Sequence, residues 1–514
     1  MIIKGKQITG YLLLLLVIFS AIYSGKAKGK FIYPEIAKTE FRSDTFNIID
    51  FGAIPGVENI KKDAINKAIL KCTESGGGTV LIPEGIWHTG PIIMQNNINL
   101  HISINTLVIF SKDFNDYPLI KSSYEGNTAW RCQSPISGNN LENIAFTGIG
   151  IFDGSGDVWR PVKKEKMTQR QWSDLIKSGG ILDERKRIWY PTEKALNGSL
   201  NSLTANSSKD NALQVKDFLR PVMVSLIECN TILIDGPTFQ NSPAWCIHPL
   251  MCENITVQNM NVRNPWYAQN GDGIDFESCR NGIITDCTFD VGDDAVCIKS
   301  GKDEEGRQRG MPTENFIVQN IIVYHGHGGF TIGSEMSGGV RNILIQNCTF
   351  LGTDIGLRFK STRGRGGVVE DIFISDIIMK DIPTNAISFN LFYGGTSPIP
   401  DSEEMEINQN VKNQPALPEA NETTPSFKNI YMNNITCNGA EQAIFIQGLP
   451  EMYVKNIVFE NVKINAEKGV FLSWVENIEF YNTSFETIES EGISKIHTKN
   501  LKFRNTMVNG KKVN

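Results

Sequence analysis

The chain has 514 residues, with 50 Lys or Arg against 56 Asp or Glu, and its formal net charge is -6. This acidic balance excludes a general nucleic-acid binder, because such a protein needs excess positive charge to neutralise phosphates. An anionic polymer could still bind where positive charge is local, and seven basic residues gather in the central stretch: Lys299, Lys302, Arg341, Arg358, Lys360, Arg363 and Arg365.

The first 27 residues have the pattern of an export signal. A basic region with Lys4 and Lys6 precedes an apolar core from Leu12 to Ile22, and Gly25-Lys26-Ala27 forms a small-residue cleavage site. The core is too short for a permanent membrane anchor. The first cysteine is Cys72, so a lipid anchor is not indicated. We therefore predict a signal peptide at 1–27 and an exported protein, periplasmic or extracellular, comprising residues 28–514.

Residues 44–110 are predicted to form an N-terminal cap that leads into the first coils. Ile65, Ala68, Ile69 and Cys72 recur at the spacing of one helix face, and three glycines at 76–78 end the helix. Such a helix can cover the open end of a stacked β-structure, whose unpaired edge would otherwise recruit other chains.

Residues 156–220 interrupt the pattern found in the rest of the chain. They contain the basic run Lys163–Lys166, a predicted helix around Gln171 to Lys177, and the aromatic residues Trp159 and Trp189-Tyr190. Two interpretations remain open. The segment is either a folded insertion packed on the side of the solenoid, or a wall of a binding cleft whose indole rings stack on sugars.

Between residues 230 and 505 one short frame recurs ten times. It consists of Asn or Asp, a strand-like apolar run such as Ile255-Thr256-Val257, and Asn or Asp five positions on. The starts lie 21 to 34 residues apart, with one interval of 58, which is typical of a solenoid. Strands without helices at this period predict an all-β, right-handed parallel β-helix with coils about 4.8 Å apart. The frames are Asn230/Asp235, Asn254/Asn259, Asn281/Asp286, Asn315/Asn320, Asn342/Asn347, Asp371/Asp376, Asn429/Asn434, Asn456/Asn461, Asn477/Asn482 and Asn500/Asn505.

Four consecutive coils each carry a polar cluster at a similar distance after the start of their frame. Stacking would bring three carboxylates, an imidazole and two cations onto one face. A turn explains any single cluster, but four in adjacent coils, with opposite charges segregated, favour a functional site. The residues are Asp272 (18 after Asn254), Asp293 and Asp294 (12 and 13 after Asn281), His327 (12 after Asn315), and Arg358 and Lys360 (16 and 18 after Asn342).

Two further features concern the rest of the chain. Residues 391–426, rich in Pro and acids, are predicted to be a long loop near one rim of the groove, so the domain is a single β-helix with insertions at 156–220 and 391–426. Cys287 and Cys348 occupy the same position of their repeats, which predicts buried core thiols, while pairing among the other eight cysteines stays open. No Cys-x-x-Cys pair occurs, and only His325 and His327 lie close together among the six histidines, so no metal site is predicted.

The ordered clusters resemble glycoside hydrolase family 28, the polygalacturonases and their relatives, which are right-handed parallel β-helices. The resemblance runs from about residue 44 to the end, apart from the two insertions, and the flanking motifs are similar to the bacterial, often exo-acting, branch. The clusters are Asn270-Gly271-Asp272, Asp293-Asp294, Gly326-His327-Gly328 and Arg358-Phe359-Lys360; the flanking motifs are Gly273-Ile274-Asp275, Ile298-Lys299-Ser300-Gly301, 332–339 and 363–367.

The resemblance implies the chemistry of an inverting glycosidase. One protonated carboxyl donates its proton to the leaving oxygen, and a carboxylate holds water on the opposite face of the sugar. The two carboxyl groups of such a pair lie roughly 6.5 to 9.5 Å apart. Three clustered aspartates cannot all ionise cheaply, so one is expected to keep its proton near neutral pH. By the family's pattern the acid is Asp293, while Asp272 and Asp294 hold the water.

The same resemblance assigns the remaining candidates. His327 would tune the acid or hold the sugar, and Arg358 and Lys360 would pair with a galacturonate carboxylate. Tyr393 is a candidate for substrate binding. Asn270 either contacts substrate or is a stacked asparagine of the turn. Turn or supporting roles are expected for Asp275 and His325, and Gly271 departs from the family, which commonly has Thr there.

The leading hypothesis is therefore a hydrolase of α-1,4-galacturonosyl linkages in pectin or polygalacturonate, exo-acting if the insertions close one end of the cleft. Its rivals are a hydrolase of rhamnogalacturonan or another galacturonide, and a non-catalytic polysaccharide-binding β-helix. A pectate lyase is less favoured, since elimination in this fold generally uses calcium and an Arg base. We expect a monomer that binds pectic polysaccharide or oligogalacturonide, with no cofactor, no nucleic acid and no membrane anchor.

Overall fold

The computed structural model describes residues 30–56, 63–202, 206–394, 418–489 and 492–513. The chain divides into two compact units, Met1–Lys30 and Phe31–Asn514. In the first unit only Lys30 is described, so the predicted signal peptide lies outside the described residues. The second unit contains every element named below. Among the described residues, we find no helix with the length and apolar character needed to cross a bilayer.

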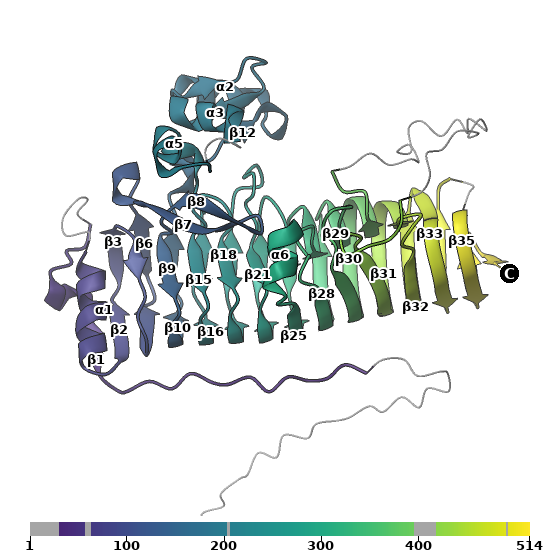
Figure 1. Cartoon of the computed structure of the whole chain (residues 1–514), viewed down its shortest axis with the longest axis horizontal. Helices are drawn as coiled ribbons and strands as arrows, with labels where there is room; N and C mark the ends of the chain where they lie inside the picture. The colour runs from purple at the N-terminus through teal and green to yellow at the C-terminus, as the bar shows by residue number, and fades with distance from the viewer. Residues whose placement is uncertain (1–29, 57–62, 203–205, 395–417, 490–491, 514) are drawn as a thin grey trace, which may run out of the picture. The chain divides into compact units, whose positions relative to one another are not determined.

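The unit Phe31–Asn514 is a right-handed parallel β-helix, as predicted (Figure 1). Its 32-stranded sheet winds around three faces, and strands in the same face of successive coils pair in parallel. We call the first the ladder face. It is formed by β1 (Thr45–Asn47), β2 (Gly78–Ile82), β5 (Ile98–Ile102), β10 (Glu142–Gly148), β16 (Asn230–Asp235), β19 (Glu253–Gln258), β22 (Arg280–Thr285), β25 (Thr313–Gln319) and parts of β28 (Val340–Leu351), β30 (Val368–Asn390), β31 (Ser426–Gln447), β32 (Val454–Ala466), β33 (Lys468–Tyr481) and β35 (Ile493–Arg504).

The other two faces follow it around each coil. The second face contains β3 (Gly85–Thr89), β6 (Thr106–Phe110), β11 (Ile151–Asp153), β17 (Thr238–Gln240), β20 (Asn261–Arg263), β23 (Thr288–Asp290), β26 (Ile322–His325), β34 (Ser484–Thr487), β36 (Thr506–Val508) and β37 (Lys511–Val513), with further parts of the long strands. The third, which we call the site face, contains β4 (Ile92–Ile93), β9 (Ile136–Asn139), β15 (Val224–Ile227), β18 (Ile247–Leu250), β21 (Ile274–Glu277), β24 (Val296–Lys299), β27 (Gly328–Ile332), β29 (Ile355–Lys360), the ends of β30 and β31 and the starts of β33 and β35.

The recurring Asn/Asp frame marks the bends of the ladder face. Asn254, Asn342 and Asn456 have φ of 55°, 53° and 58°, a left-handed conformation that Asn tolerates better than most residues. Their side chains join one coil to the next: Asn254 donates to Asn230 over 2.8 Å and Asn456 donates to Asn429 over 2.9 Å. The frame therefore supplies both the turn and a hydrogen-bond ladder along the solenoid.

The interior between the faces is apolar, and all ten cysteines are buried and free. Cys287 and Cys348 are thus core thiols, as predicted. The capping helix α1 (Ala64–Glu74) buries Ile65, Ala68, Ile69 and Cys72 against the first coils, which confirms the predicted cap.

The insertion at 156–220 is a small folded body, which Figure 1 shows projecting from the coils above the hairpin of β7 (Leu119–Tyr124) and β8 (Asn127–Cys132). Trp159 is 1% exposed and packs against Phe114 and Tyr117, which precede the insertion. Trp189 and Tyr190 are buried within the insertion, so none of the three rings is free to stack on sugars. The packed interpretation is therefore right for these three residues. The body contains α2 (Gln169–Lys177), α3 (Glu193–Leu200), α5 (Lys209–Gln214) and an antiparallel sheet of β12 (Val162–Lys163), β14 (Ile188–Tyr190) and β13 (Ile181–Leu182).

Two other segments extend from the coils. A hairpin of β7 (Leu119–Tyr124) and β8 (Asn127–Cys132) leaves the solenoid before the insertion, and helix α6 (Asp303–Arg309) follows β24. The predicted loop at 391–426 falls mostly on residues 395–417, outside the described residues. Short 3-10 helices lie at Ile48–Phe51, Phe114–Asp116, Gly156–Val158, Lys164–Lys166 and Lys216–Phe218.

Candidate active site

Three aspartates meet where adjacent strands of the site face begin. Asp272 lies two residues before β21, and Asp294 two residues before β24, whose first residues Ile274 and Val296 are register partners. Between them the Gly273 N–H donates to the Asp294 carbonyl over 2.9 Å. One carboxylate oxygen from each of Asp272, Asp293 and Asp294 lies within 4.8 Å of the others. Stacking thus brings together side chains that are 22 positions apart in the chain, as predicted.

Asp294 is the most strongly paired of the three. Its Oδ1 accepts from Arg358 Nη1 over 3.0 Å and its Oδ2 accepts from Lys360 Nζ over 2.8 Å. All three side chains are buried, with exposed fractions of 1%, 6% and 8%. Burial alone would raise the pKa of Asp294, but Lys360 and Arg358 hold that pKa well below its ordinary value. The two cations predicted to meet a substrate carboxylate therefore already neutralise Asp294.

Asp272 lies in the opposite kind of environment. Its carboxyl is 3% exposed, and its Oδ1 has no hydrogen-bond partner among the described residues. Burial, reinforced by the charge of Asp293, raises the pKa of Asp272 well above its ordinary value. Asp293 itself is only partly buried, and its Oδ1 accepts from the backbone N–H of Asp294 over 3.0 Å. The pKa values of Asp294 and Asp272 are thus shifted in opposite directions.

His327 connects this cluster to the next coil. Its Nδ1 lies 2.8 Å from Asp354 Oδ2, which orients the ring, and its backbone N–H donates to the Asp293 carbonyl over 2.9 Å. The same hydrogen bond from His327 lowers the pKa of Asp354. His325 lies outside the cluster and pairs with Asp290 on the surface over 2.9 Å.

A hollow of ≈ 390 Å³ opens beside His327 and includes Trp266, Lys166 and Asp354 in its lining. The Trp266 side chain is 43% exposed, unlike the indole rings buried in the insertion. Trp266 was not among the residues predicted from the sequence. The sequence feature that could have identified Trp266 is its position just before the Asn270 cluster, in the segment between β20 and β21.

The remaining predicted residues occupy the rim. Asn270 has φ of 54° and its Oδ1 accepts from Arg220 Nη2 over 2.9 Å, so it has the geometry of a turn residue with an added side-chain bond. Tyr393 lies with its ring centroid 5.0 Å from Lys360 Nζ and 5.5 Å from Arg358 Cζ. A Cβ on Gly271 would approach Ala268 Cβ to 2.7 Å, which explains why this chain has no Thr there.

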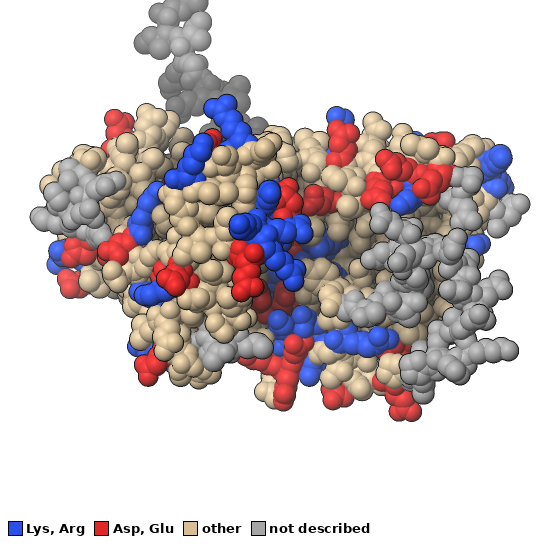
Figure 2. Space-filling model, turned by 90° about the horizontal axis from the view of Figure 1, so that it is seen from above, with Lys and Arg blue, Asp and Glu red and all other residues tan. Residues whose placement is uncertain are grey.

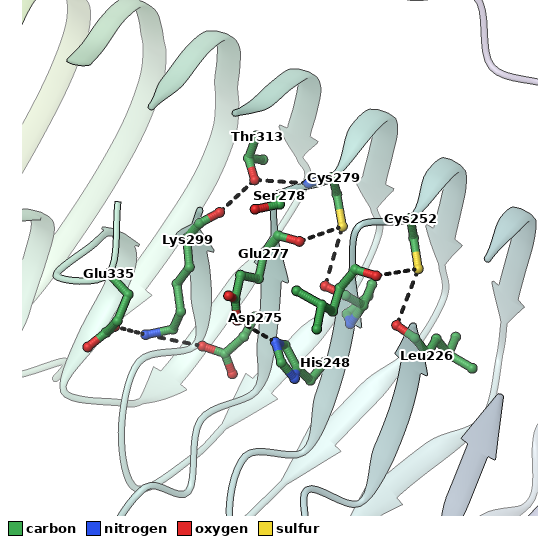
Figure 3. A network of polar contacts seen from close by, with 12 residues as sticks. Leu226, His248, Cys252, Asp275, Glu277, Ser278, Cys279, Lys299, Thr313 and Glu335 are labelled. Atoms are coloured by element: carbon green, nitrogen blue, oxygen red, sulfur yellow. Dashed lines mark hydrogen bonds and ion pairs between the residues drawn. The ribbon is translucent and has the colours of Figure 1, made fainter. Parts of the chain in front are cut away.

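A second polar network supports the site from the adjoining positions of the same strands (Figure 3). Lys299 Nζ lies 3.6 Å from Asp275 Oδ1 and 2.9 Å from Glu335 Oε2. Burial raises the pKa of Asp275 even though Lys299 opposes the shift. Glu277 accepts from Arg309 over 2.6 Å and lies 2.8 Å from His248. Asp275 thus has the predicted supporting role, whereas Glu277 and Glu335 were not identified from the sequence.

The three aspartates also have the spacing of carboxylates that could hold a cation. Both oxygens of Asp294 are already bonded to Arg358 and Lys360, so a metal ion would have to displace these contacts. The positive charge of the site is therefore supplied by side chains. Figure 2 shows Lys and Arg side chains gathered around a hollow on this side of the molecule, with acidic side chains inside it.

Comparison with known proteins gives a consistent set of similarities. A model of the glycosyl hydrolases family 28 matches residues 193–484. A probable polygalacturonase of Vitis vinifera is 27% identical over 385 residues, 73% of this chain and 69% of that protein. An exo-poly-alpha-D-galacturonosidase of Dickeya chrysanthemi is 25% identical over 462 residues, 86% of this chain and 71% of that protein. The crystal structure of a hyperthermoactive exopolygalacturonase from Thermotoga maritima superposes with a TM-score of 0.71 and 27% identity, covering 93% of this chain and 94% of the other.

Proposed function

The chain belongs to glycosyl hydrolase family 28, and we propose that it is an exo-acting polygalacturonase that cleaves α-1,4-galacturonosyl linkages in polygalacturonate with inversion. The chain is therefore a glycosidase. The observation that carries the proposal is the stacked aspartate cluster, in which Lys360 and Arg358 lower the pKa of Asp294 while burial raises the pKa of Asp272. Neighbouring carboxyl groups with pKa values pushed apart are what acid–base hydrolysis of a glycoside needs.

In the proposed reaction Asp293 is the acid and the buried pair Asp272 and Asp294 holds the water. A water that makes two hydrogen bonds of about 2.8 Å can bridge oxygens about 4.5 Å apart, close to the spacing found here. In this step Asp293 delivers a proton to the glycosidic oxygen as the bond to C1 breaks. The water attacks C1 from the opposite face, and its proton passes to the Asp272–Asp294 pair.

The closest aspartate oxygens are nearer than the roughly 6.5 to 9.5 Å expected for an inverting pair. The proposed inversion therefore rests on membership of the family, and not on that distance. Inversion of an α-linkage releases the β-anomer first, which proton NMR of the early products detects. Early release of the α-anomer would contradict this step.

The cations and the aromatic rim complete the proposed site. Arg358 uses one of its five N–H donors and Lys360 one of its three on Asp294, so both keep donors for a uronate carboxylate. His327 positions Asp293 through its backbone and presents its ring to the sugar. Tyr393 and Asn270 lie at the rim, where they would limit how the sugar enters.

We also propose that the protein is exported and acts as a monomer on pectic polysaccharide outside the cytoplasm. The apolar segment that follows two lysines at the start of the chain supports export. The single β-helix domain, with insertions at 156–220 and 391–426, supports an enzyme that is complete within one chain. N-terminal sequencing of the exported protein tests the cleavage after Ala27.

Product analysis tests the function directly. Incubation with polygalacturonate should release free galacturonate from the first minutes, with a slow fall in viscosity, and the products should not absorb ultraviolet light as unsaturated lyase products do. Rhamnogalacturonan should yield little product. Products from rhamnogalacturonan alone, or no reducing ends from any pectic fraction, would overturn the proposal in favour of the related hydrolase or of a binding protein.

The assignment of the acid needs a separate experiment. A galacturonide with a 4-nitrophenol leaving group needs little proton donation, whereas it still needs a positioned water. Asp293→Asn should therefore recover activity on this aryl substrate relative to the oligosaccharide, and Asp294→Asn should not. Equal losses on both substrates in Asp293→Asn would remove Asp293 from the acid role.

A further inference from the structure

Three arginines lie on the N-terminal side of the aspartate cluster without a carboxylate partner among the described residues. Arg160 donates to Asn241 and to the Ser242 carbonyl, and Arg220 donates to two carbonyls and to Asn270. Arg131 differs in its other contacts: no side-chain hydrogen bond joins its guanidinium to the described residues, and its Nε, like that of Arg160, is buried without a hydrogen-bond partner.

Arg131 instead lies flat on an aromatic stack. Its Cζ is 3.6 Å from the centroid of the Tyr124 ring, and Tyr124 stacks on Trp245 with centroids 5.1 Å apart. Trp245 comes just before β18, one coil from the aspartates, and the following Cys246 N–H donates to the Asp272 carbonyl over 3.1 Å. The stack therefore connects Arg131, through Tyr124 and Trp245, to the coil that adjoins Asp272.

The hairpin that carries Tyr124 and Arg131 is fixed at its tip. The Lys302 N–H donates to the Gly126 carbonyl over 3.2 Å, and Thr128 donates to Glu305 of α6 from its backbone and its hydroxyl, over 3.0 and 2.6 Å. Figure 1 shows the hairpin running above β15 and β18 toward α6. It thus crosses the coils on one side of the aspartates, where it can stop a polysaccharide chain.

We propose that Arg131, with Arg220 beside it, binds the carboxylate of the terminal galacturonate where the polysaccharide chain ends against the β7–β8 hairpin. The inference rests on the proposed function and adds the residue that selects a chain end. A partly buried guanidinium without an ion pair is unfavourable, and burial lowers the pKa of Arg131 even though the charge of Glu125 opposes the shift. A uronate carboxylate supplies a planar double acceptor that matches the guanidinium fork.

Kinetics of Arg131→Met on trigalacturonate test this binding. Met keeps an apolar side chain over Tyr124 and removes the charge. We expect KM to rise about 10- to 100-fold with little change in kcat, because the lost contact is made equally in the ground and transition states. Arg170→Met is the matched control, since Arg170 is 94% exposed on α2. A KM for Arg131→Met equal to that of the control would overturn the inference.

Thermal unfolding separates binding from a structural role. Removing an unpaired, partly buried charge should leave Tm unchanged or raise it, and Arg131→Lys should restore part of the affinity without restoring the planar contact. A large fall in Tm, with KM unchanged in the fraction that remains folded, would show that Arg131 only holds the hairpin and would overturn the inference.

A substrate change identifies the carboxylate. Trigalacturonate with one methyl ester on either terminal residue should be a poorer substrate for the wild type, and one of the two esters should have no further effect in Arg131→Met. Additive effects of both esters would overturn the inference. If the wild type releases no galacturonate from trigalacturonate at all, the proposed function fails first, and that result is distinct from a failure of Arg131.

Discussion

The site face is used in two different ways along the solenoid. One row of register partners runs through Asp275, Cys297, Thr331 and Arg358 in the central coils and continues through Ser388 to Phe445 and Phe471 near the C-terminal end. The central part of the row is charged or polar. At the C-terminal end the two Phe rings stack with centroids 5.3 Å apart.

The ladder face shows no such division. Asn342 donates to Asn315 over 2.8 Å in the central coils, and Asn477 donates to Asn456 over 3.1 Å near the C-terminal end. The fold therefore depends on the bends and the interior, which are the same in both regions, whereas the chemistry depends on the polar side chains that the site face carries only in the central coils. Substitutions in the two regions should consequently have different effects.

The largest predicted effect is a loss of turnover confined to the central coils. Asp293→Asn should lower kcat on polygalacturonate by about 10²- to 10⁴-fold, because the leaving oxygen loses its proton donor. Tm should be unchanged, since Asp293 is only partly buried. Reducing-end assays and thermal unfolding measure the two quantities. Glu441→Gln, which removes an acid paired with Lys468 in the C-terminal coils, is the control and should keep wild-type turnover. Near-normal turnover in Asp293→Asn would contradict the conclusion that the chemistry is confined to the central coils.

A loss of both stability and turnover is predicted for Asp294→Asn. The change leaves Arg358 and Lys360 buried beside a neutral amide, and breaking a buried ion pair costs about 3–5 kcal/mol. Chemical denaturation measures this loss. The double variant Asp294→Asn with Lys360→Met should recover part of the stability and none of the activity. If the double variant is less stable than Asp294→Asn, the cation does not depend on Asp294 and the ion-pair interpretation is wrong.

The pH dependence of stability should differ in sign between two aspartates of the cluster. The pKa of Asp272 is raised in the folded protein, so the unfolded chain releases this proton first and the free energy of unfolding falls as pH rises above about 4. Asp272→Asn cannot titrate, so its stability relative to the wild type should increase with pH, by at most about 1.4 kcal/mol per pH unit.

The lowered pKa of Asp294 predicts the reverse. Its contribution is present above pH of about 4 and is lost as pH falls toward the folded pKa. Asp294→Asn should therefore lose most stability relative to the wild type near neutral pH and little in acid. Denaturation curves of both variants from pH 3 to 8 measure the two trends. Parallel trends in Asp272→Asn and Asp294→Asn would contradict the division of the cluster.

Much of the fold and part of the site could be predicted because the Asn/Asp frame recurs at regular spacing in the sequence. Asn and Asp at fixed spacing mark the left-handed bends, so the distance of each cluster from its own bend gives its place on a face. This is why Asp272, Asp293, Asp294 and Lys360 were expected together. The spacing does not say which oxygen meets which cation, so the pairing of Lys360 with Asp294 emerged only from the structure.

Segments outside the repeat could not be placed in the same way. The hairpin with Tyr124 and Arg131 has no frame that fixes its position, and its register against α6 depends on contacts between residues 177 positions apart, such as Thr128 and Glu305. The burial of Trp159 was equally inaccessible, because an indole in an insertion looks the same in sequence whether it packs inside or faces a cleft.

The smallest predicted effect concerns the ladder alone, far from the chemistry. Asn456→Ala removes the hydrogen bonds to Asn429 and from Asn477 and puts a β-carbon residue without a compensating side-chain bond at φ of 58°. We expect a loss of about 1–3 kcal/mol. Asn456→Gly loses the same hydrogen bonds but tolerates the bend, so its loss should be smaller. Denaturation measures stability, and turnover at 25 °C should equal that of the wild type in both variants, since the ladder orders the coils without touching the substrate. A fall in turnover without a fall in stability would mean that the C-terminal coils take part in the chemistry after all.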